Sequence, residues 1–227
     1  IKNNVVDVVV AGGTDSLTRF TLNGFNTLMI LDKNHCRPFD ATRAGLNLGE
    51  GAGYLVLVSE KVLKEMKNMP LAEVKGFGNA NDAYHQTASS PDGQGAFLAM
   101  TKALEMSGLQ PHEIDYINVH GTGTGNNDLS EGVAMKRIFG DNIPLFSSTK
   151  PFTGHTLGAA GGLEAVISVL AIQHKMIFPN LNFSEPIPEL GFSPVVKLIE
   201  NCKVGHVLSN SFGFGGNNST LVISAIK

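Results

Sequence analysis

The chain alternates short apolar runs with glycine-rich turns and with segments of helical spacing. Continuous apolar runs at residues 5–11 and 54–58 predict strands, the first of them buried on both faces. Helical spacing of apolar residues over 95–107, followed by Gly108, predicts a helix with a glycine cap. The glycine- and asparagine-rich stretch 23–53 predicts a loop with short helical pieces.

The remaining chain alternates predicted strands and helices. Further strands are expected at residues 71–78, 114–119, 145–148, 195–199, 207–209 and 219–225. Helices are expected at 128–138, capped by Asn127 or Asp128, and at about 156–174. Such alternation predicts a mostly parallel sheet covered on both faces, closed by an antiparallel last strand. The fold class is therefore α/β.

Composition excludes several classes of protein. The chain has 227 residues, 42% of them hydrophobic and 16% charged, enough for one large domain or two small ones. With a net charge of −3 and scattered basic residues, we expect no nucleic-acid partner. The apolar stretch 157–172 carries Glu164 and is too short and too rich in glycine and alanine for a membrane span, so no membrane association is expected.

The cysteines and the amino terminus bear on the setting of the protein. Cys36 and Cys202 lack the spacing of metal ligands and are not expected to pair, so we expect no metal and a reducing, cytoplasmic setting. The chain opens with Ile1 and passes directly into an apolar run, without an initiator methionine or a signal pattern. We expect it to be a piece of a longer protein.

Two histidines in glycine-rich turns are the main candidates for chemistry. His120 lies in Val119-His120-Gly121-Thr122-Gly123-Thr124, and His155 ends Lys150-Pro151-Phe152-Thr153-Gly154-His155. Each follows a predicted strand and precedes a predicted helix, the position where ligands collect in open α/β sheets. Two neutral imidazoles there could donate hydrogen bonds to one developing oxyanion.

Seven segments, spread over nearly the whole chain, carry a family resemblance. They are Val8-Val9-Val10-Ala11-Gly12-Gly13, Arg37-Pro38-Phe39-Asp40, Gly49-Glu50-Gly51-Ala52-Gly53, Asp82-Ala83-Tyr84-His85, His120-Gly121-Thr122-Gly123-Thr124, Thr149-Lys150 with Gly154-His155, and Asn210-Ser211-Phe212-Gly213-Phe214-Gly215-Gly216. In this order they resemble the carboxyl-terminal part of a β-ketoacyl-[acyl carrier protein] synthase of the KAS I/II kind.

The resemblance implies a thiolase-like fold, layered α/β/α/β/α and built from two duplicated halves. Residues 1–60 would be the end of the amino-terminal half, and residues 61–227 the carboxyl-terminal half. A weak internal repeat agrees with this, because residues 8–58 and 207–224 each show a strand, a glycine-rich excursion and a returning strand.

The implied activity is a decarboxylative Claisen condensation of an acyl thioester with malonyl-acyl carrier protein in fatty acid or polyketide synthesis. It needs no cofactor, since the substrates ride on the phosphopantetheine arm of the acyl carrier protein. The implied partners are that carrier, the acyl and malonyl thioesters, and a second copy in a homodimer. Acyl chain length and pathway stay open.

The resemblance also assigns roles to single residues. His120 and His155 would donate hydrogen bonds from Nε2 to the enolate, and Lys150 and Glu164 would form a buried ion network that orients His120. Asp128 and Glu131 would support the site or cap a helix. Thr122 and Thr124 would hold the phosphopantetheine arm with their hydroxyls. Phe212 and Phe214 would belong to a loop that gates the acyl pocket, and Phe25 would line the acyl tunnel.

Two departures from the family pattern stand out. The family's nucleophilic cysteine lies about a dozen residues upstream of Ile1, and neither Cys36 nor Cys202 takes its place. The chain alone is therefore expected to be inactive. Leu46 stands where the family usually has phenylalanine, which leaves the shape of the malonyl side of the pocket open.

Two other classes of protein share parts of this pattern. A dinucleotide-binding domain would explain Gly121-Thr122-Gly123 between a strand and a helix, but the third glycine and the acidic ribose ligand are not in place. A non-catalytic subunit, like the chain-length factors that pair with ketosynthases, would be expected to lose the histidines. Both are present, so the catalytic interpretation is preferred.

Overall fold

The computed structural model describes residues 1–67 and 69–226. Its strands are β1 (Val8–Asp15), β2 (Gly51–Val58), β3 (Glu73–Asn81), β4 (Tyr116–Asn118), β5 (Leu145–Ser147), β6 (His206–Gly213) and β7 (Asn217–Ser224). Its helices are α1 (Arg19–Thr27), α2 (Glu60–Leu63), α3 (Gln94–Ser107), α4 (Gly125–Phe139), α5 (Lys150–Thr153) and α6 (Ala160–His174), with 3₁₀ turns η1 (Pro111–Glu113), η2 (Leu157–Ala159) and η3 (Phe214–Gly216).

The main sheet has five strands in the order β3-β7-β6-β4-β5. Strand β4 pairs in parallel with β5 and with β6, whereas β7 pairs antiparallel with β6 and with β3. The prediction of an antiparallel closing strand is confirmed. The prediction of a mostly parallel sheet is wrong, because β7 returns directly from β6 through a short turn and needs no crossover helix.

Helices cover both faces of this sheet. On one face α3 and α4 pack with Met100 and Met135 against Ile117 and Leu208, and on the other α6 packs with Val169 against the strands. Neighbouring strand residues serve opposite cores, as the pleat requires. The glycine cap predicted for α3 is confirmed, since Gly108 ends the helix in a left-handed conformation.

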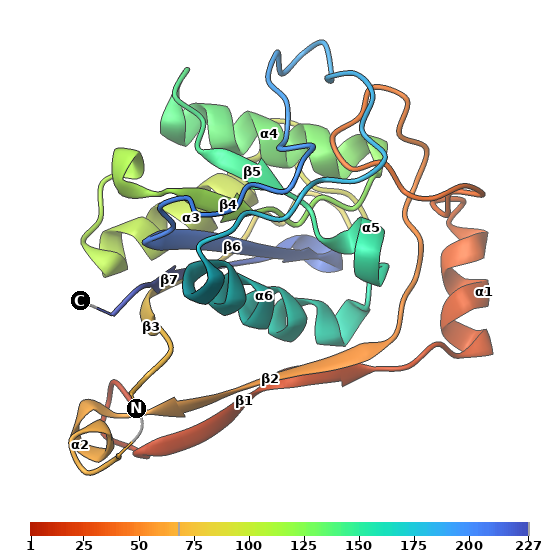
Figure 1. The fold of residues 1–227 in the computed structure, drawn as a ribbon. Helices are drawn as coiled ribbons and strands as arrows, with labels where there is room; N and C mark the ends of the chain where they lie inside the picture. Colours follow the sequence, from red (N-terminus) through yellow and green to blue (C-terminus); the bar gives the residue numbers. More distant parts are fainter. Residues whose placement is uncertain (68, 227) are drawn as a thin grey trace.

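Helix α6 is the middle layer, because the antiparallel pair β1–β2 lies on its far side (Figure 1). The approach is backbone to backbone: a Cβ on Gly13 would lie 2.0 Å from the carbonyl oxygen of Gly158. The segment Leu157–His174 has the length and apolarity of a membrane-crossing helix, but it is the helix held between these two strand layers.

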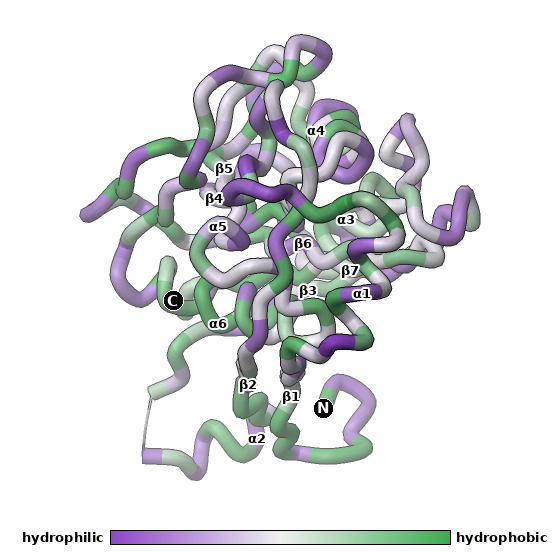
Figure 2. The backbone as a smooth tube through the Cα atoms, turned by 90° about the vertical axis from the view of Figure 1, so that its right-hand side faces the viewer, coloured by the Kyte–Doolittle hydropathy of each residue, from purple (hydrophilic) through white to green (hydrophobic). Residues whose placement is uncertain are grey.

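Strand β1 differs from its prediction. It begins at Val8 rather than residue 5, and it is half-buried on one face and exposed on the other, where Val8 and Val10 lie. On β2, Tyr54 and Val56 extend the same exposed apolar face, and Figure 2 shows hydrophobic stretches along both strands. A continuous apolar run does not tell which faces are covered. On this pair the structure places α6 and the 3₁₀ turn η2 against one face.

The helix predictions need three corrections. Residues 19–27 form α1, with Thr18 accepting the Thr21 N–H as its cap, although most of this segment was expected to be loop. Helix α4 begins at Gly125 and is capped by Thr124, not by Asn127 or Asp128. The helix expected over 156–174 starts one residue later with the 3₁₀ turn η2, and Gly154, His155 and Thr156 separate this turn from α5.

The strand expected at 195–199 is not formed. Only a single antiparallel bridge joins Ile199 to Ile177, and Val195 donates its N–H to the Phe146 carbonyl. Pro194 precedes the segment and has no N–H to extend a ladder. The boundary near residue 60 between two halves stays a prediction.

Candidate active site

His120 stands at the carboxyl end of β4 in a loop held by two buried carboxylates of α4. Glu131 accepts the N–H groups of His120 and Gly121, both at 2.9 Å. Asp128 accepts the N–H of Thr122 at 3.0 Å and that of Phe39 at 2.8 Å. Asp128 therefore does not cap α4. Its carboxylate joins the His120 loop to the segment around Phe39.

His155 lies between α5 and η2, directly after Gly154, whose positive φ favours glycine. Gly154 has φ +69°, and a Cβ there would lie 2.7 Å from the Gly49 backbone nitrogen. This close approach lets the His155 N–H donate to the Asn47 carbonyl at 2.7 Å. The loop before β2 thus fixes the backbone of His155.

Both imidazoles are held in the same tautomer. The ring centroids lie 5.2 Å apart, edge to face. Lys150 Nζ lies 3.3 Å from His120 Nδ1, and the Leu157 N–H donates to His155 Nδ1 at 3.4 Å. Because an ammonium and a backbone amide only donate here, each Nδ1 must accept, which leaves the proton of each neutral ring on Nε2.

Lys150 and Glu164 form a buried ion pair behind His120. Both side chains are almost completely buried, and Lys150 Nζ also donates to the His120 carbonyl. Ser211 of β6 donates its hydroxyl to the second Glu164 oxygen at 3.3 Å. The structure therefore joins the lysine, the glutamate and the first histidine in one network, with Ser211 as a member that the sequence analysis missed.

Burial and charge determine the protonation states. Burial, followed by the Lys150 charge, lowers the pKa of His155 to about 3 and that of His120 well below its usual value. Burial is thus the main reason that His155 is neutral. Burial raises the pKa of Glu164 against the opposing Lys150 charge, and raises the pKa of Glu131 to about 7.

The two histidines open onto a cavity of about 340 Å³. Lys150 and Glu164 lie behind its wall. Its lining also contains every substrate residue expected from the sequence: Phe25, Thr122, Thr124, Phe212 and Phe214. The two threonine hydroxyls lie 2.9 Å apart, and Thr124 also caps α4. Leu46 lines the cavity as well, together with Ile30 and Leu157.

The three phenylalanines of the cavity differ in exposure and contacts. Phe212 is buried, and its ring centroid lies 5.7 Å from that of His120. Phe214 is 48% exposed and stacks on Phe25, with 5.9 Å between centroids. Phe214 can therefore leave its contacts without opening the core, whereas Phe212, which is part of the core, cannot.

Leu157 was not anticipated in the site. It is a non-glycine residue with φ +47°, and its N–H fixes the tautomer of His155. The sequence gives no signal for this role, because the backbone N–H of Leu157 makes the contact and the side chain does not.

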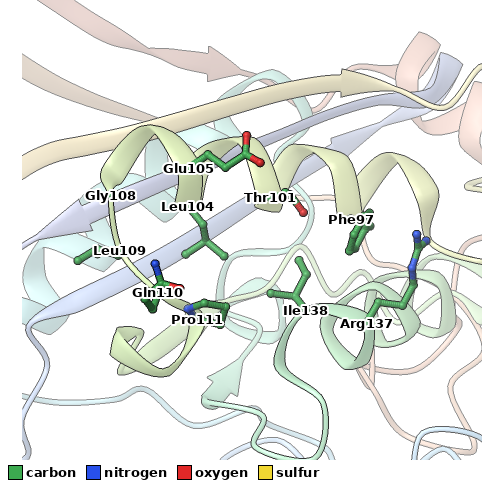
Figure 3. A pocket seen from close by; sticks show the side chains of 10 residues that line it. All are labelled: Phe97, Thr101, Leu104, Glu105, Gly108, Leu109, Gln110, Pro111, Arg137 and Ile138. Atoms are coloured by element: carbon green, nitrogen blue, oxygen red, sulfur yellow. The ribbon is translucent and has the colours of Figure 1, made fainter.

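A second hollow of about 390 Å³ lies between α3 and α4. Figure 3 shows Phe97, Leu104 and Ile138 on its sides, with Arg137 at one end. Its lining has no histidine, and so nothing like the pair of imidazoles at His120 and His155. Within residues 1–67 and 69–226, no group of three or more metal-ligating side chains is present.

Comparisons with known proteins identify the family of this chain. The family models "Beta-ketoacyl synthase, N-terminal domain" and "Beta-ketoacyl synthase, C-terminal domain" match residues 1–63 and 71–184. A 3-oxoacyl-[acyl-carrier-protein] synthase 2 of Staphylococcus aureus is 38% identical over 98% of the chain, which spans 57% of that relative's length.

Solved structures share the fold. The ishigamide ketosynthase/chain length factor superposes with a TM-score of 0.95 at 36% identity, covering 100% of this chain and 56% of that one. A type II polyketide ketosynthase in complex with its acyl-carrier protein gives a TM-score of 0.95 at 28% identity, covering 100% of this chain and 58% of that one. These are thiolase-fold ketosynthases, so the predicted fold class is confirmed. The chain belongs to the β-ketoacyl synthase family.

Proposed function

We propose that this chain supplies the histidine and lysine part of the active site of a condensing acyltransferase. The reaction is a decarboxylative Claisen condensation of an acyl thioester with malonyl-acyl carrier protein, giving 3-oxoacyl-acyl carrier protein. The observation that carries this proposal is the pair of neutral imidazoles at one cavity, each with its proton on Nε2. Two such donors suit an enolate oxygen.

The two histidines would act on the enolate that forms in this reaction. The bond between the malonyl carboxylate and C2 breaks, CO₂ leaves, and its electron pair forms an enolate whose oxygen accepts hydrogen bonds from His120 and His155. The enolate carbon then attacks the acyl carbonyl and releases the sulfur that held it. Preorganised donors in a cavity with little water stabilise that charge by several kcal/mol.

Substrates and partners follow from the same reaction. Thr122 and Thr124, which line the cavity, would bind the phosphopantetheine arm, and Phe25, Phe212 and Phe214 would contact the acyl chain. The partners would be an acyl carrier protein and a second copy of the protein, in the cytoplasm. Support for the carrier comes from the related ketosynthase solved together with its acyl-carrier protein.

The test is a condensation assay of the full-length protein with malonyl-acyl carrier protein and a series of acyl primers. The proposal expects 3-oxoacyl products, detected by mass spectrometry on the carrier, together with released CO₂. No product with any primer, by a folded and carrier-binding protein, would contradict it.

The alternative is a non-catalytic subunit of the chain-length-factor kind, because one similar structure contains such a factor beside its ketosynthase. A subunit of this kind would release no CO₂ alone and would change product length only in the presence of a separate ketosynthase. The same assay with and without such a partner separates the two functions.

A gate formed by Phe214 gives a first prediction. Its ring lies on Phe25 at the cavity, between Gly213 and Gly215, which make backbone rotation easy. Phe214→Ala should leave acyl loading intact but raise unproductive malonyl decarboxylation relative to condensation. Phe20→Ala, on the exposed face of α1, is the control. An unchanged ratio across primer lengths would show that Phe214 is packing only.

The two cysteines give a second prediction. Cys36 is buried, and burial raises the pKa of its thiol, while Cys202 lies beside the Lys175 carbonyl at the far end of α6. A helix of this length puts about 20 Å between that end and His155. Incubating this chain with a radiolabelled acyl thioester should therefore give no stoichiometric label. Stable acylation of either cysteine would be evidence against the assignment.

A further inference from the structure

The helical segment after His155 has no side-chain cap of its own. Thr156, its N-cap residue, makes no side-chain hydrogen bond to it. Instead the Leu157 N–H donates to His155 Nδ1 at 3.4 Å, and the Gly158 N–H donates to Asp15 Oδ2 at 2.9 Å. Two free N–H donors of this helical end are therefore taken by the histidine ring and by a carboxylate 143 residues away.

The turn between these two bonds is strained. Leu157 has φ +47°, a left-handed conformation that leucine rarely adopts. Such a conformation persists only where surrounding contacts hold it. Asp15 holds the N–H of Gly158, the residue after Leu157, and the His155 ring holds the N–H of Leu157 itself.

Asp15 is well placed to hold the turn. It is the last residue of β1, and its other oxygen accepts the Ser16 N–H at 2.9 Å, which fixes the carboxylate. Two residues earlier, Gly13 lies so close to Gly158 that no Cβ fits between them. The end of β1 thus packs directly against the 3₁₀ turn η2, which begins the helical segment.

We propose that Asp15 is a positioning residue for His155. By accepting the Gly158 N–H it holds Leu157 in its left-handed conformation, so that the Leu157 N–H meets Nδ1 and the Nε2 proton faces the cavity. This inference rests on the proposed function, because it matters only where His155 stabilises an enolate. Without the carboxylate, Gly158 loses its partner, Leu157 relaxes, and the ring loses its fixed direction.

The experiment uses the full-length protein and three variants. In Asp15→Ala, kcat for malonyl decarboxylation should fall about tenfold with KM for the malonyl carrier unchanged, as expected for a misplaced donor outside the binding contacts. Asp15→Asn keeps an acceptor oxygen and should recover to within about threefold of the parent. Glu50→Ala is the matched control, because Glu50 accepts the Leu17 N–H at 3.0 Å beside the same strand ends but does not line the cavity.

Crystal structures of the same variants give a readout independent of activity. The Ala variant should show Leu157 out of its left-handed conformation and the His155 ring turned, while the Asn variant should keep both. Should Asp15→Ala not fold, Asp15→Ser serves instead, because its hydroxyl is too short to reach Gly158.

The outcomes separate the two proposals. A parent without decarboxylase activity contradicts the proposed function, while the structures still decide whether Asp15 holds the turn. An active parent with an Ala variant equal to Glu50→Ala, or with His155 and Leu157 unmoved, overturns the role of Asp15. Equal losses in the Ala and Asn variants do the same.

Discussion

Replacing His120 or His155 by alanine should reduce malonyl decarboxylation by about 10²-fold or more, the effect of losing one oxyanion donor. Each ring reaches the cavity in the Nε2-protonated form, so each variant removes one donor. The measurement is CO₂ release by the full-length protein with malonyl-acyl carrier protein. His155→Asn, which keeps an N–H donor, should lose less than His155→Ala.

The matched control is His174→Ala, an exposed histidine at the far end of α6. It should leave the rate unchanged. Turnover equal to the parent in both active-site variants would refute the assignment of the two histidines.

His155 also gives a pH dependence of stability. Its folded pKa of about 3 lies below the usual value of 6.5, so between these values the unfolded chain binds a proton that the folded protein does not. The stability contributed by His155 is therefore complete above pH 6.5 and is lost as the pH falls. Between pH 7 and pH 5 the parent should lose up to about 2 kcal/mol more than His155→Asn, measured by urea unfolding. An equal loss in both would contradict the burial of a neutral ring.

Local sequence signals predicted those parts of the fold that depend on neighbouring residues. The helix ending at Gly108 and the antiparallel return of β7 follow from glycine punctuation and apolar runs, and both are confirmed. His120 could be placed at a strand end for the same reason. The same prediction for His155 is wrong, because the short helix α5 stands between β5 and this histidine. The exposed face of β1 could not be predicted, because only packing partners decide which face of an apolar strand is covered.

The finer geometry of the site depends on contacts between distant residues. Thr124 caps α4 because the Asp128 carboxylate is taken by the Thr122 and Phe39 N–H groups, the second of them 89 residues away. The left-handed Leu157 is likewise set by His155 and Asp15, and nothing in its own sequence neighbourhood marks it. The family resemblance placed Lys150 and Glu164 together, whereas periodicity alone would have left both as surface charges.

That buried pair leads to the second large expected effect. Lys150→Met leaves the Glu164 carboxylate in the core without a counter-charge and the His120 carbonyl without its donor. Breaking a buried pair from one side costs about 3–5 kcal/mol. The free energy of unfolding in urea should fall by this amount. In the control Lys102→Met it should fall far less, because the Lys102 ammonium only donates to the exposed Asn79 carbonyl.

The double variant Lys150→Met with Glu164→Gln separates stability from chemistry. It removes the unpaired charge and keeps an oxygen near the Ser211 hydroxyl, so about half of the lost stability should return. Decarboxylation should stay at least about tenfold below the parent, because His120 Nδ1 still lacks the donor that holds its proton on Nε2. If activity returned together with stability, Lys150 would act only by neutralising Glu164, and the orientation of His120 would have to come from the Glu131 contacts alone.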